Sequence, residues 1–371
     1  MNADRLPRWV ATGAIWAFLA LGACTGGQRA TAAETIANVD PTVVACDWLV
    51  KIQEADGSWD AGKWGAKTLG PIGATSLAIL SVQSVGFWET RGRFRAQLAK
   101  GLDWLETQQR PDGSFPWRSF EEQGMATLAL SEAYIMAGVA SRGQAAQRGL
   151  DYICKVQPVH GGFGDRGACA WRDADVIVTA WQFLALRSGM QAKLKVPDAS
   201  IQRVRDYLAE AKTAGADAAK SSRTGALGSL AAIACCRLLS DEAGSRKAQE
   251  AADLIMNRES RGGDPVEGGL TAEAKNDLYY RWFSGLTMLR VGGLYGDHWR
   301  TWRKVHRSVF FTTQVTEKED ARGRPILGSF DPAHCAWGDQ GGRIFATSMA
   351  ILASAVPLRF LPLNRLGWSV E

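Results

Sequence analysis

Three aspartates near the expected starts of helices are the side chains best placed to do chemistry. Asp173 and Asp175 precede an apolar run rich in small residues, and Asp277 precedes another. A carboxyl group that faces an apolar cavity retains its proton, because burial disfavours the charged form, and it can then act as a general acid. Two carboxylates facing each other could hydrolyse a glycosidic bond, and Asp173 or Asp175 could pair with Asp277 or Asp331. An aspartate at such a position also caps free backbone amides, so the catalytic and capping interpretations both stay open.

A second group of reactive types lies near the C-terminus, where Asp331, His334 and Cys335 could ligate a metal. Zinc usually takes three or four such ligands, and residues this close in sequence can share one ion only on a loop. In the competing interpretation, Asp331 and Pro332 end a Gly-Ser-Phe turn and His334 lies at the surface. No cofactor is otherwise evident, since the chain has no phosphate-binding loop, no Gly-x-Ser-x-Gly and no Cys-Gly-Glu-Gln sequence.

The composition indicates a globular protein without a nucleic-acid-binding function. The chain has 371 residues, 46% of them hydrophobic and 22% charged, and a net charge of +5. That length is enough to bury a large core. The positive charge is spread along the chain, apart from a patch at Trp299–Arg307, and no zinc-finger or RNA-binding pattern accompanies it. We therefore expect no nucleic-acid partner.

The first 24 residues have the organisation of an export signal. Arg5 and Arg8 precede the apolar run Trp9–Ala23, which is short for a membrane span. The ending Leu-Gly-Ala-Cys resembles the lipobox of bacterial lipoproteins, which implies that Cys24 carries the lipid. Residues 25–40 would then be a flexible tether, and the folded part would lie in the bacterial cell envelope, facing the periplasm or the exterior. The alternatives are an ordinary cleaved signal peptide and an uncleaved anchor.

An internal repeat organises the rest of the chain. In three places an aromatic residue stands five residues before a Gln, and Gln-x3-Gly-x-Trp/Phe follows without a gap. A shared offset and a shared turn indicate a repeated structural unit. The three copies run from Trp48 through Gln53 to Trp59, from Trp104 through Gln109 to Phe115, and from Tyr152 through Gln157 to Phe163.

Each repeat continues into a helix rich in small residues, with apolar residues three and four apart. Six such pairs can be followed, with register residues 47 to 56 positions apart. A single hairpin cannot bury both of its faces, so neighbours must stack, and six can close on themselves. The prediction is one all-α domain over residues 41–371, an (α/α)6 toroid with the small-residue helices inside. The expected inner helices are 73–80, 123–133, 175–186, 224–239, 280–289 and 342–353.

These repeats resemble the QW repeat of squalene and oxidosqualene cyclases, which protein prenyltransferase β subunits share more loosely. The segment from Gly341 to Ala350, with Arg359–Leu363 behind it, is also similar to bacterial squalene-cyclase-like proteins. The similarity extends over residues 43–363. It implies a terpenoid cyclase toroid with a central cavity for a hydrophobic, isoprenoid-like molecule or a peptide.

The resemblance also implies places for chemistry. Triterpene cyclases carry an Asp-x-Asp-Asp motif whose middle Asp protonates the substrate, and the nearest stretch here is Asp173-Ala174-Asp175-Val176. One register makes Asp175 the acid, whereas alignment on Trp181 puts Ala174 in that place. Prenyltransferases bind zinc through Asp, Cys and a distant His, and the tight spacing from Asp331 to Cys335 departs from that pattern. Further candidates for the mouth of the cavity are Trp181, Asp277, Tyr280 and Trp282.

Three functions follow from these patterns. The first is a non-catalytic toroid on a lipid tether, binding a hydrophobic molecule or a peptide, with a narrow or plugged centre. The second is an active terpenoid cyclase or prenyl-transfer enzyme, an isomerase or transferase, with Asp175 as the acid in a deep apolar cavity. The third is an exported carbohydrate-active enzyme built from six hairpins.

Overall fold

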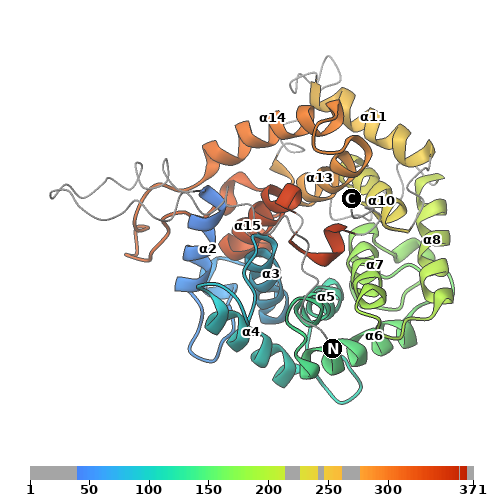
Figure 1. Ribbon diagram of the computed structural model, residues 1–371, viewed down its shortest axis with the longest axis horizontal. Coiled ribbons are helices and arrows are strands. Elements are labelled where there is room, and N and C mark those ends of the chain that lie inside the picture. The colour runs from blue at the N-terminus through green and yellow to red at the C-terminus, as the bar shows by residue number, and fades with distance from the viewer. Residues whose placement is uncertain (1–39, 214–225, 241–245, 261–275, 359, 366–371) are drawn as a thin grey trace, which may run out of the picture.

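A computed structural model describes residues 40–213, 226–240, 246–260, 276–358 and 360–365. These residues form twelve α-helices, several short 3-10 helices and four isolated β-bridges. The helices alternate between an outer and an inner ring (Figure 1), which confirms the predicted all-α double ring. Outer helices are α2 (Pro41–Lys51), α4 (Arg95–Gln108), α6 (Ala140–Val156), α8 (Asp198–Thr213), α11 (Arg246–Ser260) and α14 (Asp297–Thr313). Inner helices are α3 (Pro71–Ser84), α5 (Glu121–Ala137), α7 (Val176–Gln191), α10 (Ala226–Leu239), α13 (Leu278–Gly292) and α15 (Gly338–Ala355).

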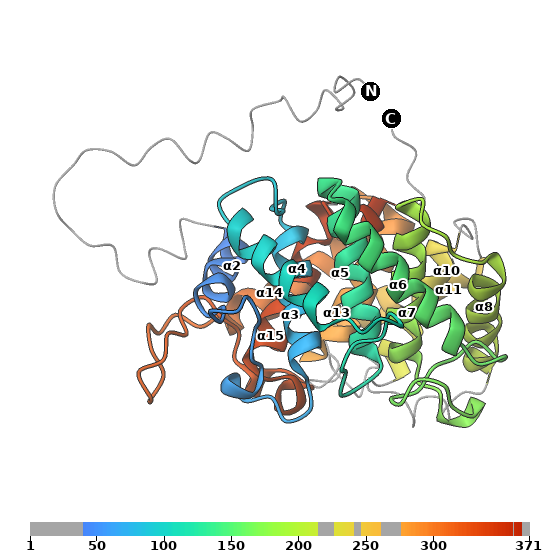
Figure 2. The ribbon, with the colours of Figure 1, turned by 90° about the horizontal axis from the view of Figure 1, so that it is seen from below.

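The inner ring is closed. Each inner helix packs on the next in chain order, and α15 packs on α3. Viewed from the side, the connecting segments gather at the two ends of the ring (Figure 2). The inner helices are buried on nearly all sides, whereas an outer helix such as α6 buries a single stripe. Small residues permit this crowding: a Cβ on Gly124 of α5 would lie 2.8 Å from the backbone carbon of Trp181 on α7.

The repeated Gln holds neighbouring outer helices together. The side-chain amide of Gln53 donates to the carbonyl of its own turn, at Gly57, and to the carbonyl of Gln97 on α4. Gln109 makes the same two kinds of bond one repeat later. In the last repeat, Gln314 donates to Gly328 O and to Pro41 O, both at 2.8 Å. The end of α14 is thereby fastened to the start of α2, which closes the outer ring.

Removing this closing side chain should destabilise the fold measurably. We expect Gln314→Ala to lower the free energy of unfolding by about 1–3 kcal/mol, because two carbonyls in buried or half-buried positions lose their donor. Equilibrium unfolding in urea measures the change. The matched control is Gln202→Ala, because Gln202 is exposed and bonds only within its own helix, to Asp206. Equal losses in the two variants would contradict a role for Gln314 in closing the ring.

Candidate functional site

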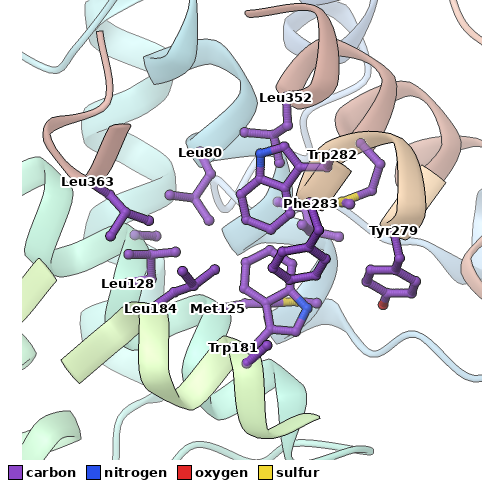
Figure 3. Close-up of a cluster of buried hydrophobic side chains, with 14 of the residues drawn as sticks. Leu80, Met125, Leu128, Trp181, Leu184, Tyr279, Trp282, Phe283, Leu352 and Leu363 are labelled. Atoms are coloured by element: carbon purple, nitrogen blue, oxygen red, sulfur yellow. The ribbon is translucent and has the colours of Figure 1, made fainter. Parts of the chain in front are cut away.

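The centre of the ring is filled by the protein's own side chains. Trp181 of α7 and Trp282 of α13 stack with their ring centroids 4.9 Å apart, and Met125 and Phe283 lie beside them (Figure 3). Trp181, Met125 and Phe283 have 0% exposed surface and Trp282 has 1%. Side chains this little exposed are in contact with other protein atoms on nearly all sides. The aromatic lining expected of a cyclase is therefore present, but its rings pack on one another.

The end of the inner ring at which its helices begin carries a buried carboxylate, and we call this end the Glu121 mouth. The hydroxyl of Tyr279, on α13, donates to Glu121 Oε2 on the opposite helix α5 at 3.1 Å. Tyr279 also packs against Phe345, with 5.3 Å between centroids. Burial among aromatic rings favours the protonated form of a carboxyl group, and a protonated carboxyl group can act as a general acid. Glu121 is not among the residues predicted from the sequence, because a Glu in a first helical turn is usually explained by the helix dipole.

The adjacent Glu122 does structural work. Its side-chain oxygens accept hydrogen bonds from the amides of Gly70 and Gly73, at 2.8 and 3.1 Å, at the start of α3. Burial raises the pKa of this carboxyl above its usual value, although the two amide donors act in the opposite direction. Glu122 thus caps α3, and Glu121 is the member of the pair that faces the ring interior.

At the end of the inner ring where its helices finish, which we call the Glu132 mouth, residues 361–365 pack between the inner helices, and we call this segment the tail. A short 3-10 helix, η7 (Pro362–Arg365), lies inside the ring (Figure 1), and Leu361 and Leu363 are each 1% exposed. The amide of Leu363 donates to both carboxylate oxygens of Glu132 at 3.2 and 3.3 Å. Gln191 donates to Pro362 O at 3.0 Å, and Arg290 donates to Leu363 O at 3.2 Å.

The aspartates singled out by the sequence lie at helix starts. Asp175 Oδ1 accepts from the amides of Ile177 and Val178, at 2.7 and 3.0 Å, and the residue is 5% exposed. Asp277 likewise caps α13 through the amide of Tyr280. Asp173 is exposed, in a 3-10 turn before α7. The capping interpretation is confirmed for Asp175 and Asp277, and catalysis by any of the three stays a hypothesis.

The expected place of Tyr280 at the mouth of the cavity is wrong. Its hydroxyl donates to Glu259 Oε1 on the outer helix α11 at 2.8 Å, so the side chain lies between the two rings. Successive helical residues point about 100° apart, and here Tyr279 faces the ring interior while Tyr280 faces away. Burial beside Glu259 raises the pKa of Tyr280 well above its usual value. Trp181 and Trp282, also predicted at the mouth, lie at the centre instead.

The candidate metal ligands behave as turn residues. Asp331 Oδ1 accepts from the amide of Ala333 at 2.9 Å and so caps the 3-10 helix η5 (Pro332–His334). His334 is exposed, and burial raises the pKa of the Cys335 thiol to about 12, which opposes the thiolate that zinc requires. Within the described ranges, no group of three His, Cys, Asp or Glu side chains is arranged to hold a metal ion. A small cavity of about 30 Å³ lies beside these residues.

The predicted export signal, Cys24 and the tether up to residue 39 lie outside the described residues. The described chain begins at Asp40, whose side chain caps α2 through the amide of Thr42 at 2.9 Å. One described stretch, Gly338–Leu358, is long and apolar enough to cross a membrane. It is 78% buried as a helix of the inner ring, which is the position of a core helix.

A buried histidine makes stability depend on pH. His306 stacks on Trp302 with 4.5 Å between centroids, and its Nε2 lies 2.9 Å from Ser354 Oγ. Burial, with a smaller effect of Arg281, lowers the pKa of His306 from 6.5 to about 3. Between these pH values the unfolded chain binds a proton that the folded protein does not. Folding stability from this group is therefore complete above pH 6.5 and is lost as the pH falls, by up to about 1.4 kcal/mol per unit.

We expect His306→Gln to flatten the dependence of unfolding free energy on pH between 6.5 and 4, because an amide does not titrate there. Urea unfolding at half-unit steps of pH measures the slope. Gln202→Ala is the control, since it changes an exposed residue that does not titrate, and it should leave the slope as it is. A slope that is the same in the wild type and in His306→Gln would show that the imidazole does not titrate differently on folding.

Comparisons with known proteins agree with this architecture. Residues 29–172 match the squalene-hopene cyclase C-terminal domain family. No curated protein matches the sequence at a significant level. Among solved structures, a variant of the type II terpene cyclase MstE from Scytonema, bound to geranylgeranyl dihydroxybenzoate, is 13% identical with a TM-score of 0.53, and the match covers 87% of this chain and 97% of that one. An MstE variant bound to merosterolic acid A gives the same identity and coverage with a TM-score of 0.50.

The same comparison finds an α-amylase from Clostridium perfringens. It is 8% identical, its TM-score is 0.53, and the match covers 85% of this chain and 96% of that one. At such identities the likeness shows the fold alone. Because a terpene cyclase and an amylase match equally well, the toroid by itself does not select a reaction.

Proposed function

We propose that this squalene-cyclase-like toroid is an exported, lipid-anchored protein that binds a hydrophobic or peptide ligand at a mouth of its ring and catalyses no cyclisation. The observation that carries the proposal is the filled centre, where Trp181 stacks on Trp282 and the two side chains are 0% and 1% exposed. A cyclase has to enclose a long hydrocarbon and hold a protonated acid against it. Here the space is occupied, and Asp175 uses its oxygen to cap α7.

The proposed anchor rests on the sequence Leu-Gly-Ala-Cys that ends at Cys24. A lipid on Cys24 and a tether that ends before Asp40, the cap of α2, would hold the ring at the surface of a membrane in the bacterial envelope. Mass spectrometry of the protein from the membrane fraction tests this part, and we expect a diacylglyceryl group on an N-terminal Cys24. A freely soluble product with an unmodified cysteine would contradict the anchor.

The absence of cyclisation is tested by incubating the purified protein with squalene and with a geranylgeranyl-bearing phenol, followed by gas chromatography and mass spectrometry. A known cyclase assayed in parallel shows that the substrates were accessible. We expect no cyclised product from the wild type. Product that disappears in Asp175→Asn would overturn the proposal, and this variant is informative because Asn keeps the helix cap.

One observation favours a second candidate, an active cyclase whose acid is Glu121. Its carboxylate is buried, faces the ring interior and bonds to Tyr279 among aromatic rings. If the wild type were active, turnover lost in Glu121→Gln and retained in Asp175→Asn would assign the acid to Glu121. The carbohydrate-active alternative has only the shared fold to support it.

A further inference from the structure

The tail of the chain is bound as a peptide ligand is bound. Three side chains from three inner helices converge on its backbone: Glu132 from α5, Gln191 from α7 and Arg290 from α13. Glu132 is itself 0% exposed, and the hydroxyl of Ser188 also donates to it. The backbone of the tail is thus hydrogen-bonded to three polar side chains that belong to inner helices.

We propose that the Glu132 mouth is a peptide-binding site for a leucine-bearing segment of the form Leu-x-Leu, which the chain's own residues 361–364 occupy in cis. This inference rests on the proposed ligand-binding function and names the ligand class and the mouth that takes it. The occupant in trans is a segment of another polypeptide that carries the same pattern.

The chemistry of the mouth selects a peptide over a hydrocarbon. A carboxylate accepts from a backbone N–H, while an amide and a guanidinium donate to the two neighbouring carbonyls. This alternation of acceptor and donors complements one peptide unit and its neighbour. An isoprenoid chain has no N–H that could replace the one Leu363 donates to Glu132, and losing a hydrogen-bond donor to a buried carboxylate is costly.

The apolar half of the site encloses the leucine side chains of the segment. Leu363 points into the ring toward Leu128 and Leu184, with Leu80 nearby (Figure 3). Leu361 is buried to the same extent, so two leucines separated by one residue are enclosed. Proline between them matches the tight turn of η7. Backbone contacts supply orientation, and the two leucine positions supply selectivity.

Occupation in cis controls access to the site. A covalently attached tail acts at an effective concentration of about a millimolar, so a free peptide at micromolar concentration cannot displace it. A substitution in the tail that weakens its binding makes the site accessible and leaves the residues that line the site unchanged. Peptide affinity should therefore rise when the tail is weakened, whereas a purely structural tail would give no peptide binding in any variant.

The test uses the full chain and a fluorescein-labelled peptide, Phe-Leu-Pro-Leu-Asn, with the sequence of residues 360–364. Fluorescence anisotropy is measured for the wild type, Leu363→Ala and the matched control Leu358→Ala, whose side chain is 40% exposed. We expect Leu363→Ala to bind the peptide at least tenfold more tightly than the wild type or the control. Replacing the second leucine of the peptide with aspartate should abolish binding.

Two further measurements keep the test decisive. Glu132→Gln placed in the Leu363→Ala background should weaken peptide binding at least fivefold, because the charged acceptor is lost. If Leu363→Ala does not unfold cooperatively, Leu363→Val replaces it, with an expected gain of at least threefold. A folded variant that shows no saturable binding overturns the inference and leaves the proposed absence of cyclisation standing. Cyclised product in the assay above would instead overturn the proposed function.

Discussion

Replacing Trp181 with alanine should lower the free energy of unfolding by about 3–5 kcal/mol, the loss typical of removing a fully buried aromatic side chain. The indole has 0% exposed surface and stacks on Trp282 at the centre of the ring. Its removal loses buried apolar area and leaves a cavity among rigid inner helices that cannot collapse. Equilibrium unfolding in guanidinium chloride measures the change.

The matched control for this variant is Trp171→Ala. Trp171 lies outside the centre, is 36% exposed and makes an edge contact with Tyr207. We expect it to cost less than about 1.5 kcal/mol. If Trp181→Ala were no more destabilising than the control, the centre of the ring would not be the packed core described above.

Glu259→Ala should also lower the free energy of unfolding by about 3–5 kcal/mol, because it removes one partner of a buried ion pair and leaves the other charge unpaired. Glu259 Oε1 lies 2.8 Å from Arg281 Nη1, and both side chains are at most 2% exposed. The same oxygen accepts the hydroxyl of Tyr280 at 2.8 Å. Thermal and urea unfolding should both report the loss.

Glu250→Ala on the same helix is the control, because Glu250 pairs with Arg246 at the exposed surface. An exposed pair one helical turn apart is worth only about 0.3–0.5 kcal/mol. Glu259→Gln separates charge from hydrogen bonding, since its amide oxygen can still accept from Tyr280. Similar losses for Glu259→Ala and Glu250→Ala would show that the buried pair does not contribute as argued.

The repeat carried most of the information about the fold. Gln53 and its counterparts recur at a fixed offset because one amide has to reach both its own turn and the next outer helix. That constraint is local and is visible in the spacing. The closing bond from Gln314 to Pro41 repeats it across the two ends of the domain. A pattern of six similar hairpins was therefore enough to predict a closed double ring.

The candidate site was harder to predict because it depends on how each helix is rotated about its axis. Tyr279 and Tyr280 are chemically alike and adjacent, yet one faces the ring interior and the other faces α11. In the same way, Glu121 faces the ring interior and bonds to Tyr279, whereas its neighbour Glu122 caps α3. Sequence periodicity near a helix start leaves such rotations undetermined.

The tail illustrates a different limit. Leu361–Asn364 has no repeat signature, and its position is fixed by contacts with α5, α7 and α13, which are far away in sequence. The similarity noted for Arg359–Leu363 does not predict where this segment lies in the ring. Only the arrangement of the inner helices shows that their carboxylate, amide and guanidinium groups meet at one point.

Fluorine NMR of the protein labelled with 5-fluorotryptophan tests the central claim most directly. The resonances of Trp181 and Trp282 are assigned with Trp181→Phe and Trp282→Phe, and spectra are recorded with squalene delivered in detergent micelles and with micelles alone. A packed centre predicts that both resonances stay where they are as squalene is added. A saturable shift of the two resonances together would mean that an isoprenoid enters the ring between the stacked indoles, which contradicts a packed centre.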